Sequence, residues 1–212
     1  MYGIGESWST GERHSGYTLD SMKCGYLVYC HPDPNSFSAS VAGRVESAFS
    51  DLGIVHTMVD LYREGFEPTM PPDEFSRKFS FDAKVQRHVG LIEEATHLAI
   101  VHPDWWGTPP ALLKGWVDRV FRPGIAYEFE GGEFTQKRSS PLLGGTRAIV
   151  FATSNDEETD AVPVIEPFWR NLFQYSGIAP YSVHVLQRLH SLDSAARVSW
   201  LASISEKIDA WV

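Results

Sequence analysis

The sequence is poor in cysteine, in basic residues and in long apolar runs. Cysteine occurs only twice in 212 residues, which excludes a small scaffold held together by disulfides. There are 18 Lys and Arg against 27 Asp and Glu, giving a net charge of −9. We therefore expect no nucleic-acid partner, because neutralising phosphates requires clustered Lys and Arg. No apolar run approaches the roughly 20 residues of a membrane-spanning helix, so we expect no membrane insertion.

Both cysteines, Cys24 and Cys30, lie in the apolar stretch CGYLVYC. On one strand they would share a face but lie too far apart to bond to each other. We interpret them as small buried residues in a reducing compartment, and there is no secretory signal. The sequence thus predicts a cytoplasmic protein. We expect residues 1–23, rich in Gly, Ser and Thr, to be a flexible extension, and residues 24–212 to be a single domain.

What the sequence does contain is a repeated alternation of short apolar stretches and helical periodicity. Strands are predicted at residues 25–30, 55–60, 97–101, 147–153 and 182–186. Helices are predicted at 38–52, 83–95, 109–123, 164–175 and 194–211. The segment 61–81 is long for a loop, which indicates function or partial structure. The Gly-rich stretch 127–145 is a candidate hairpin.

Five strand–helix units indicate an α/β fold: a five-stranded parallel sheet with helices on both faces. The count suits the doubly wound strand order 2-1-3-4-5. In such sheets, ligands bind at the carboxyl ends of the strands, near the point where the order reverses. The loops after the first, third and fourth strands are therefore the candidate functional loops.

The first of these loops reads HPDPNSFS, from His31 to Ser38. It matches neither of the two commonest phosphate-binding motifs. It does offer the hydroxyls of Ser36 and Ser38 at a helix start, where free N–H groups and the helix dipole favour an anion. The alternative is plain N-capping by Ser36 or Ser38, with a His31 that has its own partner.

The loop after the third strand carries two adjacent tryptophans, Trp105 and Trp106, bounded by prolines and Gly107. Adjacent side chains on such a loop do not both fit a core, so a planar aromatic ligand is one explanation. The alternative places one tryptophan in the core and the other on the surface. After the fourth strand, Thr153, Ser154 and Asn155 could hydrogen-bond a polar heterocycle, whereas the acidic run that follows is more typical of a solvated loop.

These loops resemble the flavodoxin-like NAD(P)H:quinone oxidoreductase family. The matching stretches are HPDPNSFS, HPDWWGTPPALLKGWVDRVF and GIAYEF, and the resemblance spans residues 25–212. It implies a flavodoxin-like fold, a bound flavin (FMN or FAD), NAD(P)H as electron donor and a homodimer with its active sites at the interface.

The resemblance also implies roles for individual residues. His31, Ser36, Phe37 and Ser38 match positions that hold the flavin phosphate and ribityl chain. Pro103, Asp104, Trp105 and Trp106 match the loop along the flavin ring. Thr153, Ser154 and Asn155 would meet the pyrimidine edge of that ring. Tyr127 and Phe129 match aromatic positions that reach the neighbouring subunit's pocket and, with Trp106, would line the substrate pocket.

One stretch departs from the family pattern. Well-known members carry a Gly-Gly pair after the fourth strand, followed by a Tyr and a His that support charge on the reduced flavin. Here the stretch reads TSNDEETDAVPV, and that pair has no counterpart.

The leading hypothesis is therefore an enzyme that passes a hydride from NAD(P)H through a flavin to a quinone-like acceptor by a ping-pong mechanism. A flavodoxin-type electron carrier and a flavin-binding regulatory subunit are the alternatives. Binding of the anionic NADPH implies a local positive patch. The candidates for it are Arg119, Arg122, Lys137 and Arg138, and the alternative is that these four residues are ordinary surface charges.

Overall fold

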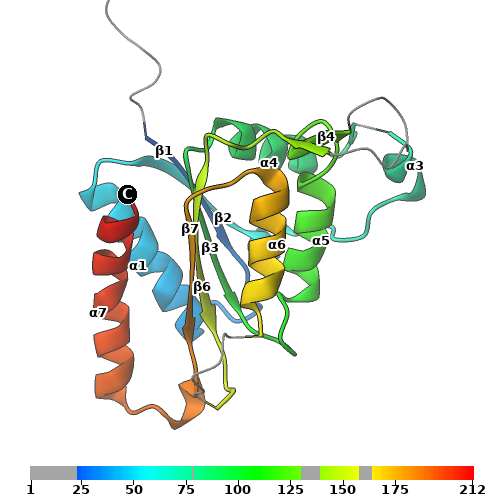
Figure 1. Cartoon of the computed structure of the whole chain (residues 1–212). Helices are drawn as coiled ribbons and strands as arrows, with labels where there is room; N and C mark the ends of the chain where they lie inside the picture. Colours follow the sequence, from blue (N-terminus) through cyan, green and yellow to red (C-terminus); the bar gives the residue numbers. More distant parts are fainter. Residues whose placement is uncertain (1–22, 78, 130–138, 158–163) are drawn as a thin grey trace, which may run out of the picture.

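The computed structural model describes residues 23–77, 79–129, 139–157 and 164–212. A five-stranded parallel sheet lies at its centre, with strand order β2-β1-β3-β6-β7 (Figure 1). Its strands are β1 (Cys24–Tyr29), β2 (Val55–Asp60), β3 (His97–Pro103), β6 (Arg147–Thr153) and β7 (Tyr181–Leu186). The remaining strands, β4 (Tyr127–Phe129) and β5 (Ser139–Pro141), form a separate antiparallel pair, so they interrupt the numbering of the large sheet.

Helices cover both faces of this sheet, as the alternating pattern predicts (Figure 1). One face carries α1 (Phe37–Asp51) and α7 (Ser194–Trp211), and the other carries α4 (Ala83–Glu94), α5 (Ala111–Val120) and α6 (Glu166–Ser176). Three of these helices begin at a residue whose side chain caps the first turn. Ser36, Asp82 and Asp193 each accept a backbone N–H in the first turn of α1, α4 and α7, which satisfies one of the N–H groups a helix start leaves unpaired.

The core consists of two apolar clusters, one on each face of the sheet. Every residue of β3 is buried, because this central strand has neighbours on both sides and helices on both faces. Trp116 and Trp169 are among the largest fully buried side chains. Part of the sequence's high tryptophan content therefore fills the core of the α4–α5–α6 face.

The long segment after β2 is partly structured. It contains two one-turn helices, α2 (Leu61–Glu64) and α3 (Pro72–Phe75), and it packs closely on α5. A Cβ on Gly115 would lie 2.3 Å from Cβ of Pro68, so a larger residue at this position would force the segment away from the helix. The candidate hairpin is also confirmed, since β4 and β5 pair antiparallel.

Two predictions about the start of the chain have different outcomes. Cys24 and Cys30 are both free and Cys30 is buried, as expected, but Cys24, at the start of β1, is only half-buried, so the prediction of a buried residue is wrong there. Apart from Lys23, the predicted extension at residues 1–23 lies outside the described residues, and the division into extension and domain stays a prediction. Within the described residues, no helix combines the length and apolar character needed to cross a membrane.

Candidate active site

A cavity of about 360 Å³ opens at the carboxyl ends of β1, β3 and β6. We call it the strand-end cavity. It is lined by His31, Asp33, Ser36, Phe37, Ser38, Pro103, Asp104, Trp105, Thr153, Ser154, Asn155, Leu189 and His190. The fold thus brings together the three loops that the sequence singles out, and all the predicted cofactor contacts except Trp106 line this one cavity.

In the loop after β1, Ser36 is the N-cap of α1: its Oγ accepts the backbone N–H of Ala39 over 3.2 Å. The Nδ1 atom of His31 accepts the N–H of Asp33 over 3.0 Å. The capping alternative is therefore the one the structure shows for Ser36 and His31. Capping uses a single N–H group, and the other first-turn N–H groups of α1 still favour an anion in front of the helix.

The loop after β1 is joined to the end of β6 by a buried hydrogen bond. The hydroxyls of Ser38 and Thr153 lie 3.0 Å apart, and both residues are buried. A second bond ties the next loop to the same strand end, from the N–H of Asp104 to the carbonyl of Thr153 over 2.7 Å. The three sides of the strand-end cavity therefore have fixed positions relative to one another.

The loop after β3 turns tightly around its two tryptophans. Trp105 and Thr108 exchange two backbone hydrogen bonds, of 3.0 and 3.2 Å. The residues between them, Trp106 and Gly107, both have positive φ, at 60° and 72°. This conformation is costly for a bulky residue such as Trp106, whose side chain is fully exposed. Trp105 lines the strand-end cavity and Trp106 points to solvent.

A buried histidine beneath this loop fixes the carbonyl at its base. His102 is fully buried, and the indole Nε1–H of Trp169 donates to its Nε2 over 3.1 Å. Because Nε2 accepts, we assign the ring proton to Nδ1, which then donates to the carbonyl of Pro103 over 2.8 Å. Burial lowers the pKa of His102 to about 4, so the ring is neutral near pH 7.

Asp104 is the acidic group of this loop. Its Oδ1 is buried and has no hydrogen-bond partner among the described residues. Burial and then the charge of Asp156 raise its pKa, against the lowering effect of the backbone N–H groups of Gly107 and Thr108. A buried acceptor without a donor fits a ligand that supplies an N–H or O–H group.

Three lining residues are absent from the set predicted from the sequence: Asp33, Leu189 and His190. Leu189 and His190 come from a short 3-10 helix, η2 (Leu189–Ser191), that follows β7. It is tied to the strand-end cavity because Asn155 Oδ1 accepts the N–H of His190 over 3.1 Å. No motif marks this segment, and only the pairing of β7 beside β6 brings it near.

The two aromatic residues predicted for the substrate pocket lie elsewhere in the chain's own structure. Tyr127 and Phe129 line a different cavity, beside α3 and α5, and their predicted role toward a neighbouring subunit stays a prediction. Lys137 and Arg138 lie outside the described residues, and Arg119 and Arg122 are buried rather than on the surface. Within the described residues, no cluster of His, Cys, Asp or Glu could hold a metal ion.

Comparison with known proteins places this geometry in a family. Residues 26–208 match the family described as flavodoxin-like fold. An Escherichia coli protein named uncharacterized NAD(P)H oxidoreductase YcaK is 30% identical over 198 residues, with 87% of this chain and 96% of that protein covered. Mouse ribosyldihydronicotinamide dehydrogenase [quinone] is 30% identical over 124 residues, which cover 50% of this chain and 54% of that enzyme.

A solved structure shares the fold at lower identity. The FMN-dependent NADH-azoreductase of Bacillus anthracis, solved in complex with FMN, superposes with a TM-score of 0.70 at 18% identity, with 89% of this chain and 99% of that chain covered.

Proposed function

This chain belongs to the flavodoxin-like NAD(P)H oxidoreductase family, and from that premise we propose that it is a flavin-dependent enzyme that passes a hydride from NAD(P)H to a quinone or a similar electrophilic acceptor. The strand-end cavity carries this proposal, because it gathers the three loops whose residues match the family's flavin contacts. The curated relatives supply the donor and the acceptor class through their names, and the azoreductase of the same fold was solved with FMN.

The residues of the strand-end cavity fit a flavin at each of its parts. The start of α1, with Ser36 and Ser38, offers N–H and hydroxyl donors for a phosphate without any net positive charge. The Trp105 side chain offers an aromatic wall for the planar ring. The unpartnered Oδ1 of Asp104 and the polar groups of Ser154 and Asn155 suit the polar edge of a heterocycle.

When bound, the flavin supplies the two-electron chemistry, and the protein supplies binding, orientation and electrostatics. His102 donates a hydrogen bond to the Pro103 carbonyl and so fixes the position of the loop after β3 at the edge of the cavity. We propose that NAD(P)H and the acceptor occupy the same side of the cavity in turn, which gives a ping-pong mechanism. Trp106, which is fully exposed on the loop after β3, would then contact NAD(P)H and the acceptor in turn.

We further propose that the active enzyme is a homodimer in which Tyr127 and Phe129 reach the partner's strand-end cavity. Both residues are half-buried in the isolated chain and pair edge to face, with ring centroids 5.3 Å apart. They lie on the short β4 strand, away from their own chain's strand-end cavity, so they cannot contribute to it from the same chain.

The test is flavin binding followed by turnover. The purified protein should be yellow, and chromatography of the flavin released on denaturation should identify it as FMN or FAD. Mixing with NADPH or NADH in a stopped-flow instrument should bleach the flavin within seconds, and a quinone should restore its colour. A carrier without turnover would stay oxidised on that timescale. Protein that takes up neither flavin would falsify the proposal.

A matched pair of variants assigns binding to the strand-end cavity. Ser38→Ala removes a buried hydroxyl at the start of α1 and should weaken flavin binding about tenfold, as expected for one hydrogen bond to a charged group. Ser47→Ala, on the same helix, removes an exposed hydroxyl that bonds only to the Gly43 carbonyl, and should leave the flavin affinity unchanged. Equal affinities in both variants would place the flavin elsewhere.

A further inference from the structure

A second cavity, of about 600 Å³, lies on the α4–α5–α6 face of the sheet. We call it the helix-side cavity. It is lined by Met70, Glu74, Phe75, Ser76, Arg77, Val117, Asp118, Phe121, Arg122, Pro123, Tyr127, Glu128, Phe129 and Leu172. It shares no lining residue with the strand-end cavity, so its occupant would be independent of the proposed flavin.

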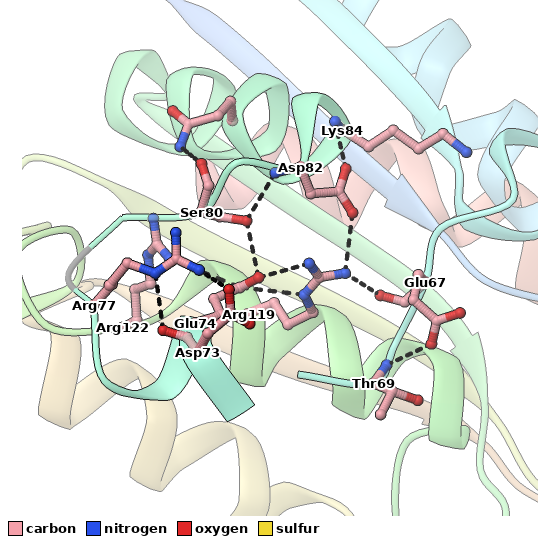
Figure 2. Close-up of polar contacts among 11 residues, drawn as sticks. Glu67, Thr69, Asp73, Glu74, Arg77, Ser80, Asp82, Lys84, Arg119 and Arg122 are labelled. Atoms are coloured by element: carbon pink, nitrogen blue, oxygen red, sulfur yellow. Dashed lines mark hydrogen bonds and ion pairs between the residues drawn. The ribbon is translucent and has the colours of Figure 1, made fainter. Parts of the chain in front are cut away.

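Glu74, one of the lining residues, belongs to a buried ion network that we call the charged floor (Figure 2). The guanidinium of Arg119 donates to both carboxylate oxygens of Glu74, over 3.2 and 2.7 Å. It also reaches the carbonyl of Glu67 at 2.6 Å and Asp82 at 3.2 Å. Ser80 donates to the same Glu74 carboxylate over 2.9 Å. Glu74 and Arg119 are therefore fully engaged with each other and with their neighbours.

Arg122 lies beside this network without being part of its hydrogen bonding. Its side chain is only 6% exposed, and its approach to Glu74 is an ion pair of 3.8 Å, too long for a hydrogen bond. Its Nε and Nη1 atoms have no hydrogen-bond partner among the described residues. Burial lowers the pKa of Arg122, and the charge of Glu74 offsets that effect only in part. A guanidinium nevertheless keeps its proton.

The unpartnered N–H groups of Arg122 require a hydrogen-bond acceptor. A buried donor that loses water and gains no partner destabilises the fold, so native proteins rarely leave one unpaired without a functional reason. Glu74 compensates the charge of Arg122 only in part, because their ion pair is too long for a hydrogen bond and the Glu74 oxygens already accept from Arg119 and Ser80. The other cation of the cavity wall, Arg77, forms an ion pair with Asp73.

The remaining walls define the rest of the ligand. Val117 and Leu172 contribute apolar surface from α5 and α6, and Phe121, just after α5, and the exposed Phe75 face the same space. The volume lies within the range of about 300–1,000 Å³ typical of small-molecule sites, which combine apolar walls with few polar anchors. A flat apolar body with one strong acceptor matches both properties.

The helix-side cavity is also lined by acidic residues, whose charges would repel an anion, but each of them has a partner. Asp118 is held by Lys114, whose Nζ lies 2.6 Å from its Oδ1, and Glu74 is held by Arg119. Glu128 has an interaction of its own as well. The charges of Glu74 and Arg119 act on Arg122 in opposite directions.

We propose that the helix-side cavity binds an aromatic carboxylate, with the carboxylate accepting from Arg122 and the ring packed between the apolar side chains of α3, α5 and α6. Charge-assisted hydrogen bonds from a guanidinium to a carboxylate are among the strongest in proteins.

The experiment compares a charged probe with its neutral counterpart. Calorimetric titration of the purified full-length protein with 2-naphthoate should show saturable binding, and 2-naphthamide, which has the same ring without the charge, should bind at least tenfold more weakly. Arg122→Gln should weaken binding of 2-naphthoate about 10- to 100-fold and leave that of 2-naphthamide unchanged. Arg170→Gln, at an exposed arginine of α6 that lines neither cavity, is the matched control and should bind both probes as the unmodified chain does.

Two further measurements keep the result decisive. If Arg122→Gln does not fold, as judged by circular dichroism, Leu172→Trp replaces it, because a larger side chain should fill the cavity and abolish binding of both probes. Sedimentation velocity reports self-association. Equal affinity for both probes, or binding that survives both substitutions, overturns the proposal. A dimer that binds the probe supports the proposal, whereas a dimer that excludes it overturns the proposal, because the occupant of the cavity would then be the second copy of the chain.

Discussion

The strand-end and helix-side cavities are built in opposite ways. The strand-end cavity is made of loop residues at the ends of strands, and hydrogen bonds from Ser38 and Asp104 to Thr153 tie its loops together. The helix-side cavity is made of helix faces and a long connecting segment, and its lining residue Glu74 belongs to the buried charged floor. The first presents several polar groups from three loops, and the second has one cation, Arg122, with unpartnered donors.

The difference follows from where each cavity lies. Parallel strands end together at one edge of the sheet, so their loops meet there whatever their sequences are, and short side chains suffice to line the space. The helix-side cavity lies where the segment after β2 crosses α5. Backbone groups of that helix bond within the helix, so side chains alone supply its polarity.

The largest expected effect concerns the charged floor. Arg119→Met would leave the Glu74 carboxylate buried without its main partner, and we expect the free energy of unfolding to fall by about 3–5 kcal/mol. Urea unfolding measures this. Lys114→Met, which removes the exposed ion pair with Asp118 on the same helix, should cost less than about 1 kcal/mol. A similar, small loss in both variants would mean that the floor is not a buried network in solution.

The next prediction concerns how the stability of the strand-end side of the protein depends on pH. Burial lowers the folded-state pKa of His102 to about 4 from an ordinary 6.5, so the unfolded chain binds a proton that the folded chain does not across that window. Stability should therefore fall as pH drops from 6.5 to 4, by up to about 3 kcal/mol for this residue. His102→Gln should reduce the slope measured by urea unfolding at several pH values without abolishing it, because burial also lowers the pKa of His97 and His184 to about 4.

The charged floor responds to acid in a lower window. Burial by itself would raise the pKa of Glu74, but hydrogen bonds from Arg119 and Ser80 and the arginine charges hold it below its ordinary value of 4.5. Its stabilising effect is thus present above pH 4.5 and is lost as pH falls further. Arg119→Met should remove acid sensitivity in this lower window only.

A fourth prediction compares two buried tryptophans. The indole of Trp169 donates to His102 beneath the strand-end cavity, and that of Trp116 donates to His88 over 2.9 Å. Substitution by Phe removes one buried hydrogen bond and part of a fully buried ring in each case, so stability should fall by about 2–3 kcal/mol. Only Trp169→Phe should also weaken flavin binding, by about tenfold, because the His102 proton can then move and release the Pro103 carbonyl. Equal flavin affinities would show that this contact is purely structural.

The smallest expected effect concerns Trp106. Asn tolerates its left-handed conformation better than a bulky residue does, so Trp106→Asn should raise the free energy of unfolding by up to about 1 kcal/mol. If Trp106 contacts the acceptor, the same variant should raise KM for a quinone while thermal unfolding moves to higher temperature. Trp105→Phe keeps an aromatic wall at the strand-end cavity and serves as the control. A variant that is less stable and unchanged in KM would contradict both expectations.

Much of the strand-end cavity was predictable from the sequence. The residues 31–38 and 103–106 and the residues 153–155 follow strands whose apolar pattern is continuous, and parallel strands bring their carboxyl ends together. The exception, Trp106, follows from backbone conformation, because the turn with Gly107 directs its side chain outward. The sequence predicts only that His102 follows a buried strand. Its role in holding the Pro103 carbonyl depends on Trp169, which lies 67 positions away in the chain.

The amino-acid sequence by itself determined the order of strands and helices, the positions of the candidate loops and the family resemblance, because periodicity, capping and motifs are local along the chain. Tertiary structure decided which nitrogen of His102 accepts a hydrogen bond and how Glu74 and Arg119, 45 positions apart, came to share a buried site. It also left Arg122 without an acceptor. These outcomes depend on packing between distant segments. In a buried site, each unpaired donor and each charge changes the free energy of folding more than it would in water.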